Sequence, residues 1–348
     1  MNADYVNLRM VFRAPFLGAA LAGWGLLLSP ADVDARATLT RIEVSGEPTA
    51  VYGMNDAGVI TGTYNWDTGF LRSPDGAITS FGVPGAGQVV SVGINNNGVV
   101  AGNYTDPSGT WEPFIRNADG SIVTYQVPGA LNAHMGAIND AGTVAGSWND
   151  SNELPHIFVR SADGTITTYD IPETWAITVS GINTRGYVVG YYYDRTNTYR
   201  GFLMAPNGTI TTIDAPDSGE ETVLTGINDK GVIVGWSRAH GGFVRETDGT
   251  FRTIACPEGG TSCLVYSVNN QEKIAGSAYV PARNTYVGFM QASTGRTRTF
   301  HPGHERDGIV PQKINASGWI AGWYWLKQST GSGSGRRSSI PVGFLWVP

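Results

Sequence analysis

A short frame that recurs seven times constrains the fold more than any other feature. The frame is Asn-x-x-Gly-x-x-x-Gly, with Glu272 replacing the first glycine in the sixth copy. Its asparagines are Asn55, Asn95, Asn139, Asn183, Asn228, Asn269 and Asn315. A Phe follows in every copy, and most copies then carry a turn pair such as Asp119-Gly120 and a closing Pro. The frame returns every 40 to 46 residues, a period typical of propeller blades and other repeat arrays.

Each repeat is predicted to form four short strands. In the second repeat they are expected at residues 90–94, 99–104, 113–116 and 121–127, which are rich in Val, Ile, Tyr and Phe. Asn-x-x-Gly suits a type I turn, and Asp-Gly suits a tight hairpin. No helical spacing extends beyond the N-terminal segment. We therefore predict an all-β fold, a seven-bladed β-propeller with four-stranded blades. A single open β-solenoid is the alternative.

The two ends of the chain favour a closed ring. Blades are expected to begin near residues 49, 89, 133, 177, 222, 264 and 309. The last repeat stops at residues 343–348 without a fourth strand, whereas residues 39–44 resemble a fourth strand at the other end. The N-terminal strand is predicted to complete the last blade and so remove exposed sheet edges. In the sixth repeat, Glu272 predicts a turn that is strained or differently shaped.

The repeat resembles a bacterial family. The Gly-Ile-Asn, Gly-Phe and Asp-Gly elements over residues 49–348 are similar to HAF repeats, described as probable extracellular repeats. The His-Ala-Phe triplet of that family is approached only by His156-Ile157-Phe158, so the match is carried by Phe and Gly. The resemblance implies secretion and a β fold, and it implies no activity.

Residues 1–37 are predicted to be a secretory signal peptide. Arg9 and Arg13 precede an apolar run, and Ala35-Arg36-Ala37 fits a small-x-small cleavage site. An uncleaved anchor is the alternative. The mature chain, residues 38–348, is expected to be secreted or periplasmic and has no apolar tract long enough to span a membrane. A formal charge of −6 opposes nucleic-acid binding.

Two cysteines, Cys256 and Cys263, lie in one predicted loop. In an exported protein they are expected to form a disulfide. A metal site is the alternative, but two thiols without further ligands make half a zinc site. We predict neither a metal nor a cofactor. A Gly- and Ser-rich insertion at residues 327–339 is predicted to be a mobile loop.

The connections between strands predict which face carries function. First-to-second and third-to-fourth turns are uniform and are expected to be structural. Second-to-third and fourth-to-first loops vary and share the opposite face, which is the typical place for a binding site. All five histidines fall in these loops: His134, His156, His240, His301 and His304. Ligand-binding candidates are the aromatic residues Trp66, Trp111, Trp175, Tyr193, Trp236 and Trp325. Catalytic candidates are His240, His304, His134, Tyr193 and Arg238.

Three functions are compatible with such a face. An aromatic, polar-rimmed mouth suits a binding module for a carbohydrate or another small ligand. The second hypothesis is a lyase or hydrolase that acts on an extracellular polysaccharide or a cyclic small molecule, with histidine as general acid or base and arginine stabilising an anion. The third is a cell-surface platform for protein interaction. Loop histidines are also commonly plain surface groups, and no linear catalytic motif decides between these functions. A monomer is expected.

Overall fold

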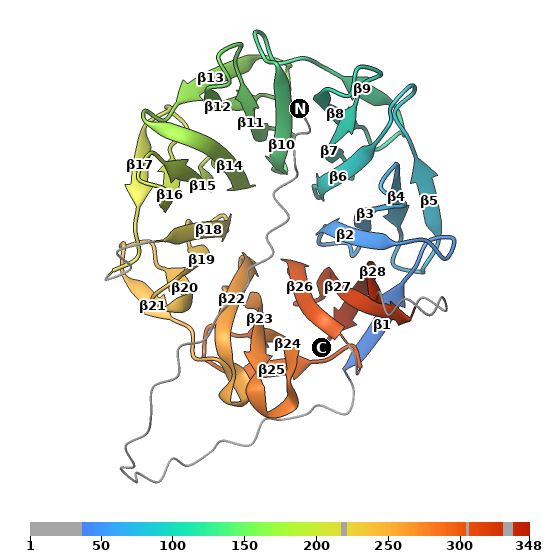
Figure 1. Ribbon diagram of the computed structural model, residues 1–348, viewed down its shortest axis with the longest axis vertical. Coiled ribbons are helices and arrows are strands. Elements are labelled where there is room, and N and C mark those ends of the chain that lie inside the picture. The colour runs from blue at the N-terminus through green and yellow to red at the C-terminus, as the bar shows by residue number, and fades with distance from the viewer. Residues whose placement is uncertain (1–36, 217–220, 304–305, 330–336) are drawn as a thin grey trace. The chain divides into compact units, whose positions relative to one another are not determined.

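Seven four-stranded antiparallel sheets stand around a central channel, as Figure 1 shows for the computed structural model. The structure describes residues 37–216, 221–303, 306–329 and 337–348. This architecture is a seven-bladed β-propeller, so the predicted fold class is confirmed. The predicted signal peptide and His304 lie outside the described residues.

Each blade runs from an innermost strand at the channel to an outermost strand at the periphery. The innermost strands of blades 1 to 7 are β2 (Thr49–Met54), β6 (Val89–Ile94), β10 (Asn132–Ile138), β14 (Thr174–Ile182), β18 (Thr222–Ile227), β22 (Thr261–Val268) and β26 (Arg306–Ile314). The second strands are β3 (Ile60–Tyr64), β7 (Val100–Thr105), β11 (Val144–Asn149), β15 (Val188–Asp194), β19 (Ile233–Ser237), β23 (Ile274–Val280) and β27 (Ile320–Ser329).

The outer half of each blade completes the sheet. The third strands are β4 (Thr68–Arg72), β8 (Trp111–Arg116), β12 (Pro155–Arg160), β16 (Tyr199–Met204), β20 (Gly241–Arg245), β24 (Thr285–Gln291) and β28 (Arg337–Val347). The outermost strands are β5 (Ile78–Phe81), β9 (Ile122–Thr124), β13 (Ile166–Asp170), β17 (Ile210–Ile213), β21 (Phe251–Thr253), β25 (Thr297–Phe300) and β1 (Thr38–Ile42). Two 3-10 turns are also present, η1 (Pro257–Gly259) and η2 (Pro281–Arg283).

Blade 2 shows where the strand prediction needed correction. Three of its strands lie within two residues of the expected bounds, but β9 spans only Ile122–Thr124 instead of residues 121–127. The pairing of β8 with β9 reaches Phe114 opposite Thr124. The next residue of β8 is Pro113, which has no N–H to continue the ladder.

The recurrent glycine and phenylalanine of the frame form one packing unit. In every blade the second glycine of the frame lies opposite the Phe that recurs in each repeat, on the neighbouring strand, as Gly146 lies opposite Phe158. A Cβ on Gly146 would come within 2.2 Å of the His134 carbonyl oxygen and 2.5 Å of the Phe158 ring. The phenylalanines of all seven units are at most 2% exposed. The glycine is therefore required by the ring that covers it, and this pair fills the centre of each blade.

The asparagines of the frame join the blades to one another. Each Asn Oδ1 accepts the backbone N–H four residues on and so closes its own turn, as Asn139 does with Thr143 at 3.0 Å. Each Asn Nδ2 donates to the backbone carbonyl of the equivalent Asn in the next blade. The seven distances, starting from Asn55, are 3.3, 3.0, 2.9, 3.1, 3.0, 2.8 and 3.5 Å. The last bond returns from Asn315 to Asn55, so the seven carboxamides form a closed belt around the channel.

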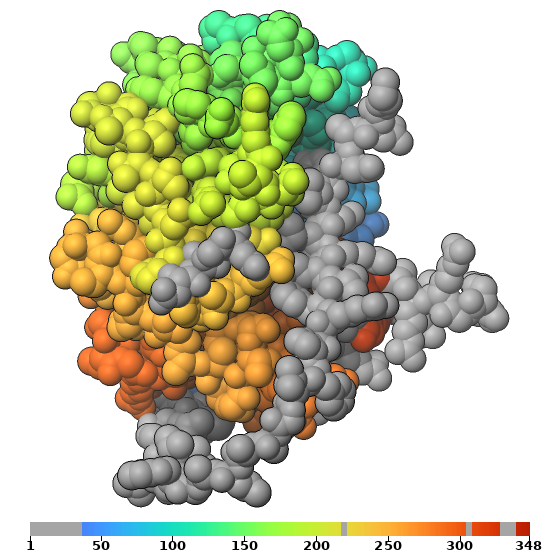
Figure 2. Space-filling model, turned by 60° about the vertical axis from the view of Figure 1, so that its left-hand side comes forward, coloured from blue at the N-terminus to red at the C-terminus, as the bar shows by residue number. Residues whose placement is uncertain are grey.

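The ring also closes through the chain ends. Strand β1 pairs with β28, with Leu39 opposite Trp346, as predicted from the sequence. Ile42 of β1 packs in one cluster with Val51 of blade 1 and Leu345 of blade 7. Figure 1 shows the blue β1 lying against the red β28, and Figure 2 shows blades 3 to 6, coloured green to orange, as a continuous outer wall.

Glu272 resolves the question about the sixth turn. Its N–H donates to the Asn269 carbonyl at 3.0 Å, which is the same bond that glycine makes in the other repeats. Its φ is 62°, in the left-handed region. The turn therefore keeps its shape, and the glutamate carries the strain.

The insertion at residues 327–339 is partly regular, in contrast to the mobile loop predicted. Strand β27 continues to Ser329 and pairs there with Arg337 of β28, so both ends of the insertion extend the blade 7 hairpin. Residues 330–336 lie outside the described ranges.

The belt generates a pH-dependent prediction. Asn139→Ala removes one buried and one partly buried hydrogen bond and is expected to lower the free energy of unfolding by about 2–4 kcal/mol. Asn139→Asp keeps the turn-closing oxygen but places a carboxylate against the Asn183 carbonyl, which raises the folded-state pKa of that Asp above its ordinary value of about 3.9. Its protonated form can donate as the amide does, so the deficit relative to wild type should shrink as pH falls from 7 toward 4.

Urea unfolding of both variants and of wild type across this pH range measures the effect. Asn207, an exposed turn residue outside the belt, supplies the control variant Asn207→Asp. A deficit for Asn139→Asp that is constant with pH would contradict the donor role of the belt amide.

The predicted disulfide is present. Cys256 and Cys263 are joined, and their Cα atoms are 5.6 Å apart. Cys263 is buried in the blade 6 core cluster, and Cys256 packs against the same cluster. The bond therefore ties the loop between blades 5 and 6 to the core.

Replacing both cysteines by serine is expected to lower the free energy of unfolding by about 2–3 kcal/mol, the chain-entropy value for so short a loop. Denaturant unfolding of the double variant measures this cost. Reductant should shift the wild-type curve toward that of the variant and leave the variant curve unchanged. An unchanged wild-type midpoint after complete reduction would refute a stabilising role.

Candidate functional site

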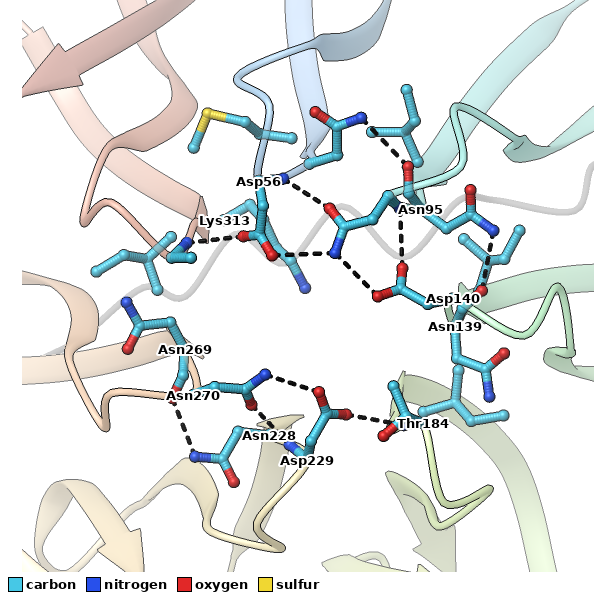
Figure 3. A pocket seen from close by; sticks show the side chains of 18 of the residues that line it. Asp56, Asn95, Asn139, Asp140, Thr184, Asn228, Asp229, Asn269, Asn270 and Lys313 are labelled. Atoms are coloured by element: carbon cyan, nitrogen blue, oxygen red, sulfur yellow. Dashed lines mark hydrogen bonds between the residues drawn. The ribbon is translucent and has the colours of Figure 1, made fainter. Parts of the chain in front are cut away.

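A polar cavity of about 120 Å³ lies at one end of the channel, on the side of the ring that carries the asparagine turns. We call this side the turn face and the opposite side the loop face. Figure 3 shows side chains from all around the ring converging on the cavity. The turns that line it, which were predicted to be structural, enclose this cavity.

Three successive layers of side chains build this cavity. The residue before each belt asparagine is apolar and forms the inner layer: Met54, Ile94, Ile138, Ile182, Ile227, Val268 and Ile314. The belt is the middle layer. The residue after each asparagine forms an outer layer that we call the rim: Asp56, Asn96, Asp140, Thr184, Asp229, Asn270 and Ala316. The cavity thus has a polar mouth above an apolar floor.

The rim is a second circle of hydrogen bonds. The backbone N–H of one rim residue donates to the side-chain oxygen of the next, at 2.7–2.9 Å. These bonds join Ala316 to Asp56, Asp56 to Asn96, Asn96 to Asp140, Thr184 to Asp229 and Asp229 to Asn270. The circle is interrupted at Thr184 and at Ala316, whose side chains do not accept the N–H of the preceding blade. The rim therefore consists of two arcs.

A lysine stands among these acids. Lys313 lines the cavity, and among the described residues no carboxylate lies within ion-pairing distance of its Nζ. The Lys313 side chain is exposed to the water in the channel. Withdrawal from bulk water lowers the pKa of Lys313, and the charges of Asp56, Asp140 and Asp229 oppose that effect. Burial alone would raise the pKa of Asp229, but hydrogen bonds from Thr184 and Asn270 bring it below its ordinary value.

On the loop face, the structure brings several predicted residues together at blades 4 and 5. Tyr193 packs against Tyr199, with ring centroids 5.0 Å apart. The backbones of Tyr199 and Glu221 form an isolated parallel β-bridge. The Glu221 carboxylate accepts two hydrogen bonds from the Arg238 guanidinium, at 3.1 and 3.2 Å. Burial raises the pKa of Tyr199, and Tyr191, Tyr193 and Glu221 add to the rise, so Tyr199 keeps its proton at neutral pH.

Trp175, near the start of β14 in blade 4, is exposed on the loop face. It is the unpaired residue of a bulge in β14, between Thr174 opposite Asp194 and Ala176 opposite Tyr193. The Thr174 hydroxyl fixes the bulge, because it lies within hydrogen-bonding distance of the Ala176 and Tyr193 carbonyls. Trp175 is 59% exposed, and the Arg195 guanidinium lies 5.5 Å from its ring centroid. Bulges that turn a side chain outward are common beside functional sites.

The remaining aromatic candidates are spread around the ring. Trp66 is 45% exposed in the blade 1 loop. The ring centroids of Trp111 in blade 2 and His134 in blade 3 are 5.7 Å apart. Trp325 packs edge-on against Trp323 in blade 7. Trp236 is half-buried in β19. Trp66, Trp111 and Trp325 therefore belong to blades 1, 2 and 7, whereas Trp236 belongs to blade 5.

His134 and His156 were predicted to lie in loops, but the structure places them in strands, because β10 begins at Asn132 and β12 at Pro155. Each of the described histidines contacts a partner of its own. His240 Nε2 lies 2.7 Å from the Pro216 carbonyl, and His156 Nδ1 lies 2.6 Å from an Asp170 carboxylate oxygen. His301 Nε2 lies 3.2 Å from the Thr285 hydroxyl. Among the described residues, no group of His, Cys, Asp or Glu is arranged to hold a metal ion. Within the same ranges, no helix is long and apolar enough to cross a membrane.

Sequence reasoning did not select Lys313 or the rim, although a signal for them exists. Lys313 stands two residues before its belt asparagine, opposite Ala321. The equivalent residues of the other blades are small: Gly53, Gly93, Ala137, Gly181, Gly226 and Ser267. The seventh repeat therefore departs from the pattern at two channel positions, Lys313 and Ala316.

Comparison with known proteins supports the architecture. No family model matches the sequence, and no curated protein matches it by sequence. Among solved structures, streptogramin B lyase aligns with a TM-score of 0.58 at 14% identity, covering 89% of this chain and 97% of the lyase. A prolyl endopeptidase aligns with a TM-score of 0.58 at 11% identity over 85% of this chain. The acylaminoacyl peptidase of Pyrococcus horikoshii aligns with a TM-score of 0.52 at 10% identity over 79%.

The likeness is one of fold. This chain spans about half the length of each peptidase, 50% and 49% respectively, and nearly all of the lyase. Sequence identities of 10–14% do not show that this chain shares the activity of any of these proteins.

His134 generates a prediction about acid stability. Burial lowers the pKa of His134, so the folded protein favours its neutral form. The unfolded chain binds that proton near pH 6.5, so this histidine should cost stability progressively as pH falls below about 6.5. His134→Gln is expected to reduce the loss of thermal stability between pH 6.5 and 4.5. Melting temperatures of wild type and variant at matched ionic strength measure this. Parallel pH profiles would contradict the assignment.

Proposed function

We propose that this protein is an exported propeller-type binding module that holds a carbohydrate on its loop face, at blades 4 and 5. The observation that carries the proposal is Trp175, a large aromatic ring held 59% exposed by a bulge. An exposed indole offers a flat apolar surface to the C–H face of a sugar ring. Arg195 lies against the Trp175 ring, and Tyr193 lies opposite the next residue, Ala176, so both are available as polar partners for hydroxyl groups.

Export is part of the same proposal. A disulfide such as Cys256–Cys263 persists in oxidising compartments and is rare in the cytosol. The similarity of the sequence frame to HAF repeats and the signal-like residues 1–37 support the same location.

The test is a glycan-array and soluble-polysaccharide binding screen on the purified protein, followed by titration of the best ligand. Trp175→Ala is expected to weaken binding by about 2 kcal/mol, or about 30-fold, because it removes the stacking surface. Trp66→Ala is the matched control, since Trp66 is also exposed but lies in blade 1. Equal affinity of Trp175→Ala and wild type, or equal losses for the two variants, would reject the site.

A lyase is the second candidate, favoured by Tyr199. Tyr199 pairs with Glu221 in a β-bridge, and Glu221 holds Arg238, so Tyr199 is placed to donate a proton while Arg238 stabilises a developing anion. Assays for chain cleavage of a polysaccharide, and for conversion of streptogramin B followed by mass spectrometry, detect this activity. Activity that persists unchanged in Tyr199→Phe would exclude the assignment.

A further inference from the structure

Within the rim, the bound Asp140 side chain shows how this cavity can hold a carboxylate. The two oxygens of Asp140 accept from two donors of Asn96. Asn96 N donates to Oδ1 at 2.8 Å, and Asn96 Nδ2 donates to Oδ2 at 2.9 Å. Asn96 Nδ2 also donates to Asp56 on its other side, at 3.0 Å. One asparagine thus holds the carboxylate of the next blade with both its backbone and its side-chain N–H groups.

Asn270 repeats this arrangement without the carboxylate. Its Nδ2 donates at 2.7 Å to Asp229 of the preceding blade, as Asn96 does to Asp56. The next rim residue is Ala316, which has no oxygen to offer. Among the described residues, the Asn270 backbone N–H and the second Nδ2 hydrogen have no acceptor. The blade 7 turn has the same hydrogen bonds as the blade 3 turn, so a carboxylate at position 316 would occupy the place of Asp140.

The same blade supplies a cation. Lys313 projects into the channel from a position where the other blades have Gly, Ala or Ser, and Figure 3 shows it within the ring of rim residues. The seventh repeat thus has an alanine where the other repeats have a polar rim side chain, and a lysine where they have a small residue. The gap at Ala316, which we call the notch, presents two N–H donors of Asn270, and Lys313 lines the same cavity.

The second interruption of the rim lacks these features. At Thr184 the Asp140 backbone N–H has no acceptor among the described residues, but the Asp140 side chain has no N–H to add. This position offers one donor next to an acid, so it suits a water molecule. Of the two interruptions, only the blade 7 notch offers both a backbone and a side-chain N–H group.

The surrounding charge restricts the class of ligand. Asp56, Asp140 and Asp229 face the cavity with Lys313, so three carboxylates oppose one ammonium group. A simple anion would be repelled by the three acids, whereas a zwitterion offers them an ammonium group. We propose that the turn-face cavity binds a small amino acid, with its carboxylate in the blade 7 notch at Asn270 and Lys313 and its ammonium group toward the rim aspartates. This site is separate from the loop-face site and does not depend on it.

The decisive variant fills the notch from within. Ala316→Asp places a carboxylate where the ligand carboxylate would lie, so it is expected to raise the melting temperature of the ligand-free protein and to weaken amino-acid binding at least about 100-fold. Lys313→Met should weaken binding about 10-fold. Ser317→Asp is the matched control, because it adds the same charge one residue on, at an exposed position of the same turn.

Calorimetric titration of the full chain with glycine, acetate and methylamine separates the contributions. Glycine is expected to bind more tightly than acetate, which the three aspartates repel, and more tightly than methylamine, which leaves the Asn270 N–H groups and Lys313 without an anion. Absence of binding for glycine and larger amino acids would overturn the proposal, as would unchanged glycine affinity in Ala316→Asp. If Ala316→Asp does not fold, Ala316→Asn supplies a neutral acceptor for the Asn270 N–H and should also weaken binding. Glycine affinity unchanged by Ala316→Asn would then overturn the proposal.

Discussion

The closed belt of asparagine carboxamides is the interaction on which the channel end of the molecule depends. Each side chain closes its own turn through Oδ1 and reaches the next blade through Nδ2, so one residue type fixes both the local turn and the spacing of the blades. Because the belt asparagines are 2–6% exposed, an unpaired amide or carbonyl there would carry its full desolvation cost. The belt thus makes the seven blades cooperative at the axis, while β1 and β28 close the ring at its periphery.

A rigid, repeated frame allows a site to be made by few substitutions. Positions next to the belt all point into the same channel, so a change in one repeat places a new group at a defined point of the ring. In blade 7, Lys313 replaces a small residue and Ala316 replaces a polar one, which converts a structural circle into an asymmetric cavity. On the loop face the same scaffold holds Trp175 through a bulge at the start of β14. The two ends of the channel therefore have different chemistry on one architecture.

The sequence predicted the architecture well because the repeat reports local requirements. Gly146 is required by the Phe158 ring and Asn139 by its turn, so both recur at fixed spacing and reveal the blades. The exchange of β1 into blade 7 followed from counting strands. The site was harder to predict, because the spacing of residues along the sequence does not show which residues of different blades lie close together. His134, His156 and His240 share a face, yet they bind separate local partners. The useful signal at the turn face was departure from the repeat, at Lys313 and Ala316, where uniformity had suggested only structure.

Hydrogen exchange of asparagine side-chain amides, followed by NMR, tests the belt most directly. With Nδ2 resonances assigned by single Asn→Gln replacements, all seven belt amides should each retain one slowly exchanging proton, lost at the rate of global unfolding. The exposed side-chain amide of Asn207 should exchange rapidly in the same sample. Fast exchange of the belt amides while the strand N–H groups stay protected would show that the blades are held together without the belt, and would contradict this account.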